Sequence, residues 1–156
     1  MSIHKVPAEK RFWPKVNVTE TCWHWTGAKN EKGYGLFYAD DKPIRAHRYS
    51  YQRVNGPIPD GLQIDHTCHN PACVNPEHLR AVTVKQNNEN RTTRTPTISG
   101  VRGVHMRIDG KWYGRVCHNK QTYRTRGFAT IPEAEAAVVA LRLELFTHND
   151  LDRRAS

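Results

Sequence analysis

The sequence predicts an α+β protein made of two small units. Residues 20–64 alternate short apolar runs with turn residues, a pattern typical of hairpins. A polar stretch at 85–99 cannot form a core and separates the two halves. After it, three strand-like segments precede a segment whose apolar residues recur at helical spacing. We therefore predict units at 1–90 and 100–148, a linker at 91–99 and a tail at 149–156.

The first half contains one predicted helix and one segment of unusual composition. The helix is expected at 44–54, because Gly56-Pro57 and Pro59 follow it and would end it. Residues 64–79 are rich in Cys, His and Asn. Chemistry is therefore expected in this second segment rather than in the helix.

The second half predicts a three-stranded antiparallel sheet packed on one helix. Strands are expected at 101–108, 111–117 and 122–128, separated by polar turns. In the middle strand Gly114 and Val116 would share one face and Arg115 the other. The helix is predicted from Ala134, Ala137, Val138, Leu141 and Leu145, with Pro132 and Glu133 near its start.

The composition points to a polyanionic partner. The chain of 156 residues carries a net charge of +9, a surplus that favours nucleic acid through steering and counterion release. A membrane is the less favoured partner, because no stretch approaches the roughly 18 apolar residues of a spanning helix and the N-terminal residues contain no signal-peptide core. We therefore expect an intracellular, cytoplasmic protein with no membrane partner. With 37% hydrophobic residues, units this small need an additional staple.

Cysteine and histidine spacing suggests that this staple is zinc. Four residues separate Cys68 from Cys73, and four separate Cys73 from His78, which suits tetrahedral Zn²⁺ with thiolate and imidazole ligands. Cys22 would complete a set of four ligands. The alternatives are disulfides, or a buried apolar Cys22 with His78 as an ordinary core histidine. A reducing compartment favours the metal.

Asp65 and His66 carry a second kind of chemistry. A carboxylate can hold a hard cation, and a neutral imidazole can take a proton from water. A strand would place these neighbours on opposite faces, so only a turn would let both converge. On these two residues alone, an ordinary loop pair is an equally good interpretation.

The flanking residues decide between these interpretations by resemblance. Residues 22–87 resemble the HNH nucleases of phages and mobile elements, within the ββα-metal superfamily, and the Cys and His spacing is similar to that of His-Cys box homing endonucleases. The resemblance rests on Asp65-His66, Cys68, Cys73, Asn75-Pro76 and His78-Leu79, and on the flanking motifs at 22–27, 33–35, 46–48 and 56–59.

That resemblance implies a zinc-stapled ββα-metal fold and assigns roles to the site residues. His66 is implied as the general base, and Asp65 and Asn87 as ligands of a catalytic Mg²⁺ or Mn²⁺, with Asn88 as the alternative to Asn87. The last histidine of the motif binds the catalytic ion in many HNH enzymes, but here its spacing assigns His78 to structural Zn²⁺. Asn75 is expected to tie the loop together by hydrogen bonds, while His47 and Arg48 would either pack the helix or contact phosphate.

The second half is similar to APETALA-type DNA-binding domains over residues 99–146. Residues 100–104, Lys111-Trp112, 127–130 and the Ala-rich helix carry this resemblance. It implies DNA contacts by Arg102, Arg107, Arg115 and Arg124, and the strand alternation adds Arg126. Residues 85–127 contain ten Lys or Arg residues and only two acids. A merely solvated basic face is the alternative.

Together these features predict a metal-dependent endonuclease that hydrolyses double-stranded DNA, of phage or homing type. They do not distinguish a nick from a double-strand cut, or a monomer from a homodimer. The main alternative is a zinc-containing DNA-binding regulator that does not cleave, although such a module has no need of Asp65, His66 and Asn87 together. An RNA-binding zinc protein is less favoured, because no aromatic stacking motif is evident.

Overall fold

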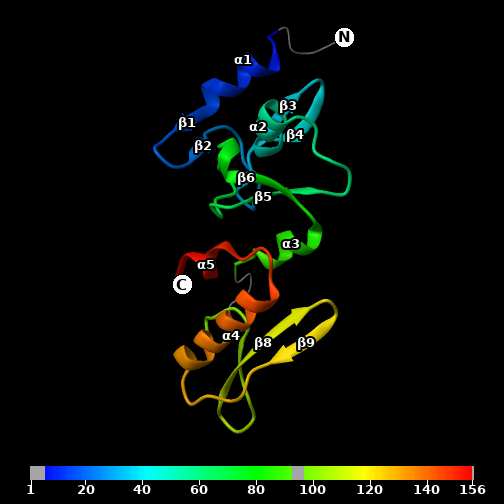
Figure 1. The fold of residues 1–156 in the computed structure, drawn as a ribbon. Coiled ribbons are helices and arrows are strands. Elements are labelled where there is room, and N and C mark those ends of the chain that lie inside the picture. Colours follow the sequence, from blue (N-terminus) through cyan, green and yellow to red (C-terminus); the bar gives the residue numbers. More distant parts are fainter. Residues whose placement is uncertain (1–5, 93–96, 156) are drawn as a thin grey trace. The chain divides into compact units, whose positions relative to one another are not determined.

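The computed structural model describes residues 6–92 and 97–155 of the chain. These residues form two compact units, Met1–Val84 and Lys85–Ser156, and each unit is described by itself (Figure 1). The mixed α+β prediction is confirmed in both. Within the described residues, no helix is long and apolar enough to cross a membrane.

The first unit consists of three two-stranded antiparallel sheets and short helices. Its elements are α1 (Ala8–Phe12), η1 (Trp13–Lys15), β1 (Val16–Val18), β2 (Trp23–Trp25), β3 (Leu36–Ala39), β4 (Lys42–Arg45), α2 (Ala46–Asn55), β5 (Gln63–His66), η2 (Pro76–His78) and β6 (Leu79–Val82). The sheets pair β1 with β2, β3 with β4 and β5 with β6. The predicted helix at 44–54 is present as α2, but it begins two residues later because Ile44 and Arg45 pair with β3.

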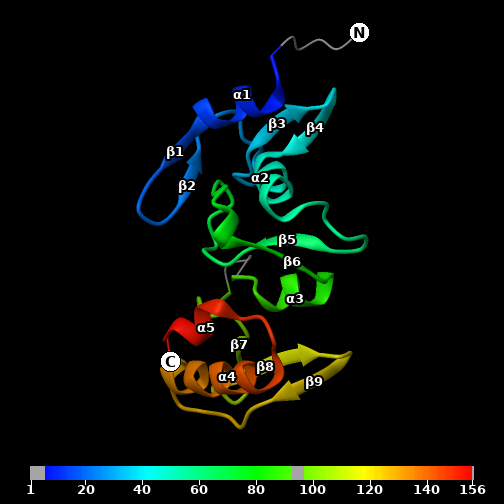
Figure 2. The ribbon, with the colours of Figure 1, turned by 45° about the horizontal axis from the view of Figure 1, so that its top comes forward.

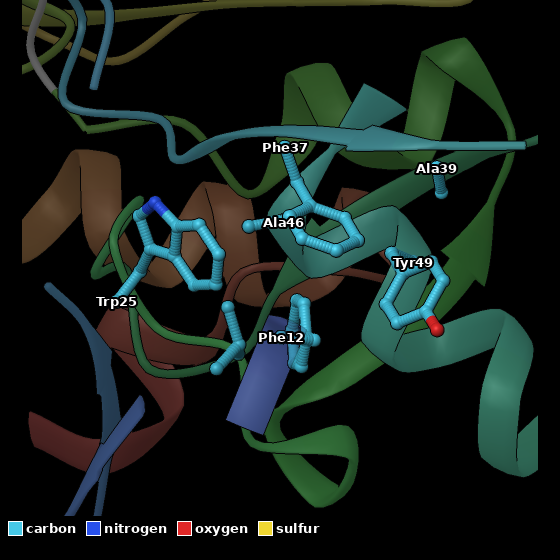
Figure 3. Close-up of a cluster of buried hydrophobic side chains, with 7 residues drawn as sticks. Phe12, Trp25, Phe37, Ala39, Ala46 and Tyr49 are labelled. Carbon is cyan, nitrogen blue, oxygen red and sulfur yellow. The ribbon is translucent and has the colours of Figure 1, made fainter. Parts of the chain in front are cut away.

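Phe12 lies at the centre of the first unit's aromatic core (Figure 3). Its ring centroid is 5.0 Å from that of Trp25, 5.1 Å from that of Phe37 and 4.8 Å from that of Tyr49. Gly35 permits this packing, since a Cβ there would lie 2.6 Å from the Trp25 ring. The core therefore ties α1 to β2, β3 and α2, which fixes the position of α2.

The second unit contains the predicted three-stranded antiparallel sheet and a helix that covers it (Figure 2). Its elements are α3 (Val84–Glu89), β7 (Val104–Met106), β8 (Trp112–His118), β9 (Gln121–Arg124), α4 (Ile131–Leu145) and α5 (Asp150–Ala155). The strand order is β7-β8-β9. Helix α4 starts with a capping box, in which Thr130 and Glu133 each satisfy the other's backbone N–H.

The face of the sheet toward α4 is apolar, as the strand alternation predicted. Gly114 and Val116 are buried, whereas Arg115 and Cys117 on the same strand are exposed. A Cβ at Gly114 would lie 2.6 Å from Cβ of Val138 on α4. The helix and the strand therefore approach each other as closely as a glycine allows.

The C-terminal segment departs from the predicted tail at 149–156. It forms α5, and a buried ion pair holds it to α4: Arg142 Nε lies 2.6 Å from Asp152 Oδ2 and Nη2 lies 2.8 Å from Oδ1. This geometry is bidentate, the strong form of an arginine to carboxylate contact. The predicted linker at 91–99 falls partly on 93–96, which lie outside the described residues.

Candidate active site and metal centre

Cys22, Cys68, Cys73 and His78 converge in the first unit. Cys22 precedes β2, Cys68 and Cys73 lie in the loop after β5, and His78 ends η2. Their ligand atoms all lie within 4.8 Å of one another. His78 Nδ1 is 3.7 Å from Cys22 Sγ and 3.6 Å from Cys73 Sγ. Around a tetrahedral Zn²⁺ with bonds of about 2.3 Å to sulfur and about 2.0 Å to nitrogen, sulfur and nitrogen lie about 3.5 Å apart. The donor set and its spacing fit zinc.

The loop that carries these ligands is tied together by Asn75. Its side chain accepts a hydrogen bond from Glu77 N at 3.1 Å and donates one to Thr21 O, also at 3.1 Å. Its backbone N–H donates to Cys73 Sγ at 3.4 Å. The side chain thus joins the Cys22 segment to the loop, and the backbone favours a thiolate at Cys73. This is the tying role expected of Asn75.

Cys68 and Cys73 are in hydrogen-bond contact, and this contact shifts the pKa of both thiols. A hydrogen bond from Cys73 lowers the pKa of Cys68 to about 4. The same bond, together with burial, raises the pKa of Cys73. A divalent cation binds cysteine sulfur in its deprotonated form. Metal binding to this pair would therefore release the proton that remains on the thiol.

His66 is held at the end of β5 by the same loop. It is 6% exposed, and its Nε2 lies 3.1 Å from the carbonyl oxygen of Cys73. A carbonyl only accepts hydrogen bonds, so Nε2 carries the proton and the lone pair of the neutral ring is on Nδ1. Burial lowers the pKa of His66, which favours that neutral form near pH 7.

Asp65 is also buried, and Arg80 on the neighbouring strand pairs with it. Asp65 is 8% exposed, and Arg80 donates two hydrogen bonds to its Oδ2, from Nε at 3.2 Å and from Nη2 at 2.9 Å. The two residues are register partners in the β5-β6 sheet. Arg80 was not among the residues predicted for the site. Only the pairing register brings it there, and local sequence gives no signal for that register.

His47 lies beside His66 and is equally buried. The two ring centroids are 4.7 Å apart, and the Tyr34 ring lies 5.4 Å from His47 and 5.9 Å from His66. Burial, with smaller contributions from His66, Arg48 and Arg45, lowers the pKa of His47 to about 3. Within the described part of the chain, its Nδ1 is buried without a hydrogen-bond partner. His47 thus packs its ring against Tyr34 and His66, and the predicted choice between helix packing and phosphate contact stays open.

Asn87 and its alternative, Asn88, lie on α3, the helix that follows β6 in the chain. Both belong to the second unit, whereas Asp65 and His66 belong to the first. The order strand, strand, helix is therefore present along the sequence. The shared cation site of Asp65 and Asn87 stays a prediction.

The arginines predicted to contact DNA fall into two groups. Arg115 and Arg124 are exposed and directly opposite each other on β8 and β9. Arg107 and Arg126 are also exposed, Arg107 with Asp109 3.4 Å away and Arg126 over the Phe128 ring. Arg102 differs.

Arg102 is engaged inside the second unit. Its guanidinium donates to the carbonyl oxygens of Glu89 at 3.0 Å and Asn88 at 3.4 Å, and it lies over the Phe146 ring. Burial, followed by the charge of Arg142, lowers its pKa. These contacts hold the C-terminal end of α3, which is a structural use of the side chain. A family pattern that assigns Arg102 to DNA does not reveal this use.

Comparison with known proteins identifies a matching family model and several relatives of the chain. Residues 45–89, which run from the end of β4 through α3, match the family model described as HNH endonuclease. Protein 3.8 of Escherichia phage T7 is 31% identical over 115 residues, which cover 73% of this chain and 92% of that protein. Residues 45–89 therefore form a domain of the HNH endonuclease family, and the chain is a relative of T7 protein 3.8.

Other relatives of this HNH chain are also viral. Protein 7.7 of phage T7 is 41% identical over 81 residues, or 52% of this chain and 62% of that protein. An uncharacterized HNH endonuclease, L560, of Acanthamoeba polyphaga mimivirus is 27% identical over 135 residues, or 86% of this chain and 66% of that protein. The chain spans under two thirds of the length of T7 proteins 7.7 and 2.8, at 62% and 64%. No solved structure matches it. The HNH match ends at residue 89, so the APETALA-type resemblance of the second unit stays a prediction.

Proposed function

We propose that this protein is a metal-dependent DNA endonuclease in which His66 is the general base. The observation that carries the proposal is the hydrogen bond from His66 Nε2 to the carbonyl oxygen of Cys73, 3.1 Å long. It selects the ring tautomer whose Nδ1 can accept a proton, and burial keeps that ring neutral.

In this mechanism Nδ1 of His66 takes a proton from water as the water oxygen attacks phosphorus. The bond from phosphorus to the 3′-oxygen breaks, and the leaving oxygen is protonated from solvent. Asp65 and Asn87, or Asn88 in its place, would hold a Mg²⁺ or Mn²⁺ ion. When bound, that cation supplies neutralisation of the charge that develops on the phosphate and on the leaving oxygen. Arg80 positions the Asp65 carboxylate through two hydrogen bonds to one oxygen.

The Cys22, Cys68, Cys73 and His78 cluster has a structural role in this proposal. Four protein ligands fill a tetrahedral Zn²⁺ site and leave no position for a substrate or water. The cluster fixes the loop whose backbone holds His66, because Cys73 supplies both a ligand atom and the accepting carbonyl. Zinc would therefore act on catalysis only through the position of the base.

The second unit is proposed to bind double-stranded DNA through its arginine-bearing sheet face. Arg115 and Arg124 are opposed on that face, and Arg107 and Arg126 extend the exposed basic surface. A β-sheet can present such side chains to a DNA groove. The internal hydrogen bonds of Arg102 make it the weakest member of the predicted set.

Plasmid cleavage tests the proposal. Purified protein with supercoiled plasmid and Mg²⁺ or Mn²⁺ should give relaxed or linear product, and none when EDTA replaces the metal. His66→Ala should abolish cleavage while duplex binding and thermal unfolding stay near those of the wild type, because the variant removes the base and keeps the scaffold. His148→Ala, a ring outside the proposed site, is the matched control and should cleave normally. Wild-type protein that binds DNA without cutting it would indicate the non-cleaving regulator instead.

A further inference from the structure

The first unit has a basic hollow that the proposed catalytic mechanism does not use. Its volume is about 770 Å³, and its lining comes from the N-terminal helical segment, the β3-β4 hairpin and the start of α2. Four of the lining residues are basic, Arg11, Lys15, Arg45 and Arg48, and no acidic residue lines it. We refer to these four residues and the space between them as the basic hollow.

The charges of the basic hollow are not neutralised within the protein. In residues 6–92 and 97–155, none of the four basic side chains forms an ion pair. Arg11 donates only to a backbone oxygen, that of Val6. By contrast, Arg53 on the same helix as Arg48 pairs with Glu9 at 2.8 Å. Four uncompensated cations around one concavity create a field that attracts an anion and disfavours the empty site.

The floor of the basic hollow is apolar and partly aromatic. Leu36, Tyr38 and Ile44 line it, and Leu36 is 40% exposed. A cationic rim that follows the phosphates and an apolar or aromatic floor that packs on a base are the features with which proteins bind single-stranded nucleic acid. The volume is that of an ordinary small-ligand pocket, which is large enough to admit a nucleotide base.

The basic hollow and His66 are supported by the same elements of the first unit. Arg45 and Arg48 flank His47, whose ring centroid is 4.7 Å from that of His66. Tyr34, two residues before Leu36 in the chain, packs against both of these rings, with its centroid 5.4 Å from that of His47 and 5.9 Å from that of His66. The hollow and the proposed base therefore belong to the same unit and are connected through the start of α2 and the segment before β3.

We propose that the basic hollow binds an unpaired segment of the DNA substrate, an inference that rests on the proposed endonuclease function. The rim residues bind its phosphates, and a base lies against Leu36 and Tyr38. The substrate class that follows is DNA with an unpaired stretch, such as an overhang, a flap or a branch, in preference to a continuous duplex.

The test measures binding of fluorescein-labelled oligothymidylate to the full chain carrying His66→Ala, by fluorescence anisotropy over a series of salt concentrations. Arg45→Gln with Arg48→Gln should weaken binding tenfold or more. Each phosphate bound on a single strand contributes about 0.7 to the slope of log affinity against log salt, so this slope should fall by about 1.4. Arg53→Gln, the same substitution on the same helix outside the hollow, should change affinity less than twofold.

Matching melting temperatures establish that the variants fold. Equal loss of affinity in the Arg53→Gln control, or no loss in the double variant, would overturn the inference. Tighter, hollow-dependent binding of oligouridylate would also overturn it, because RNA would then be the ligand. Plasmid cleavage by the wild type is read separately. Cleavage without hollow-dependent binding rejects the hollow alone, and hollow-dependent binding without cleavage rejects the endonuclease while the single-strand site stands.

Discussion

Asp65 faces two competing partners, the guanidinium of Arg80 and the cation proposed to bind its carboxylate. Two N–H groups of Arg80 donate to Oδ2 of Asp65, and Asp65 is only 8% exposed. A buried carboxylate without a charged partner is costly to keep ionised. Arg80 can therefore stabilise the fold before the metal arrives and oppose the metal through its like charge afterwards.

This competition predicts opposite effects of Arg80→Met on stability and on metal binding. Without divalent cations the variant should lose about 1–3 kcal/mol of unfolding free energy, because a buried charge-assisted pair is broken. Added Mg²⁺ should recover more stability in the variant than in the wild type, since the repelling guanidinium is gone. Denaturant unfolding with and without Mg²⁺ measures both. Arg80→Lys keeps the charge and should behave more like the wild type. Equal responses to Mg²⁺ in all three proteins would move the cation site away from Asp65.

At the scale of elements, the Cys and His loop determines where His66 lies. We predict one zinc per chain, bound with free energy on the order of 10 kcal/mol or more. Cys22→Ser should lower the zinc content and the melting temperature, and cleavage should fall even at saturating Mg²⁺ because the Cys73 carbonyl no longer holds His66. Cys117→Ser is the matched control, since Cys117 is exposed and lies in the second unit. Metal analysis by atomic absorption checks the content. Well-folded wild-type protein without zinc would refute the assignment.

The close approach of β8 to α4 gives a second element-scale prediction. Gly114→Ala adds a methyl group 2.6 Å from Cβ of Val138, so overpacking should destabilise the second unit by about 1–3 kcal/mol. Val138→Gly removes the Cβ of Val138 itself, so it leaves a cavity alone and makes room for that methyl group. The double variant should therefore lose less stability than the sum of the single variants. Additive losses of stability in thermal unfolding would mean that the residues at positions 114 and 138 do not touch in solution.

The elements that the sequence predicted are those with a repeating local signal. Helix α4 followed from apolar residues at 3.6-residue spacing, and the two faces of β8 followed from alternation. The convergence of Cys22 with the loop ligands followed from ligand chemistry. Helix α5 was missed because six residues do not form a helix alone, and its stability comes from the ion pair of Arg142 with Asp152. Arg80 was not predicted, and the internal contacts of Arg102 were not foreseen, because the partners of both residues are set by strand register and by tertiary contacts.

In the whole molecule, the two units have different proposed roles. The first would cut the DNA and hold an unpaired strand, and the second would supply duplex affinity and most of the sequence preference. The exposed arginines of the sheet face and the internally bonded Arg102 then have different consequences when changed, although one resemblance assigned them the same role.

Arg115→Gln with Arg124→Gln should weaken duplex binding and lower the slope of log affinity against log salt by about 0.9 for each phosphate that the variant no longer binds, with little change in stability. Removal of a hydrogen bond to a base would instead cost roughly 1–3 kcal/mol at one position of the site. Arg102→Gln should do the reverse: it removes the hydrogen bonds to the Asn88 and Glu89 carbonyls, so melting temperature should fall while the salt slope stays constant. Binding to labelled duplexes over a salt series, with melting curves of the same preparations, measures both quantities. If Arg102→Gln lowered the slope as much as the sheet-face pair without a loss of stability, Arg102 would bind DNA directly after all. If Arg115→Gln with Arg124→Gln left duplex affinity unchanged, the second unit would not be the part of the protein that recognises DNA.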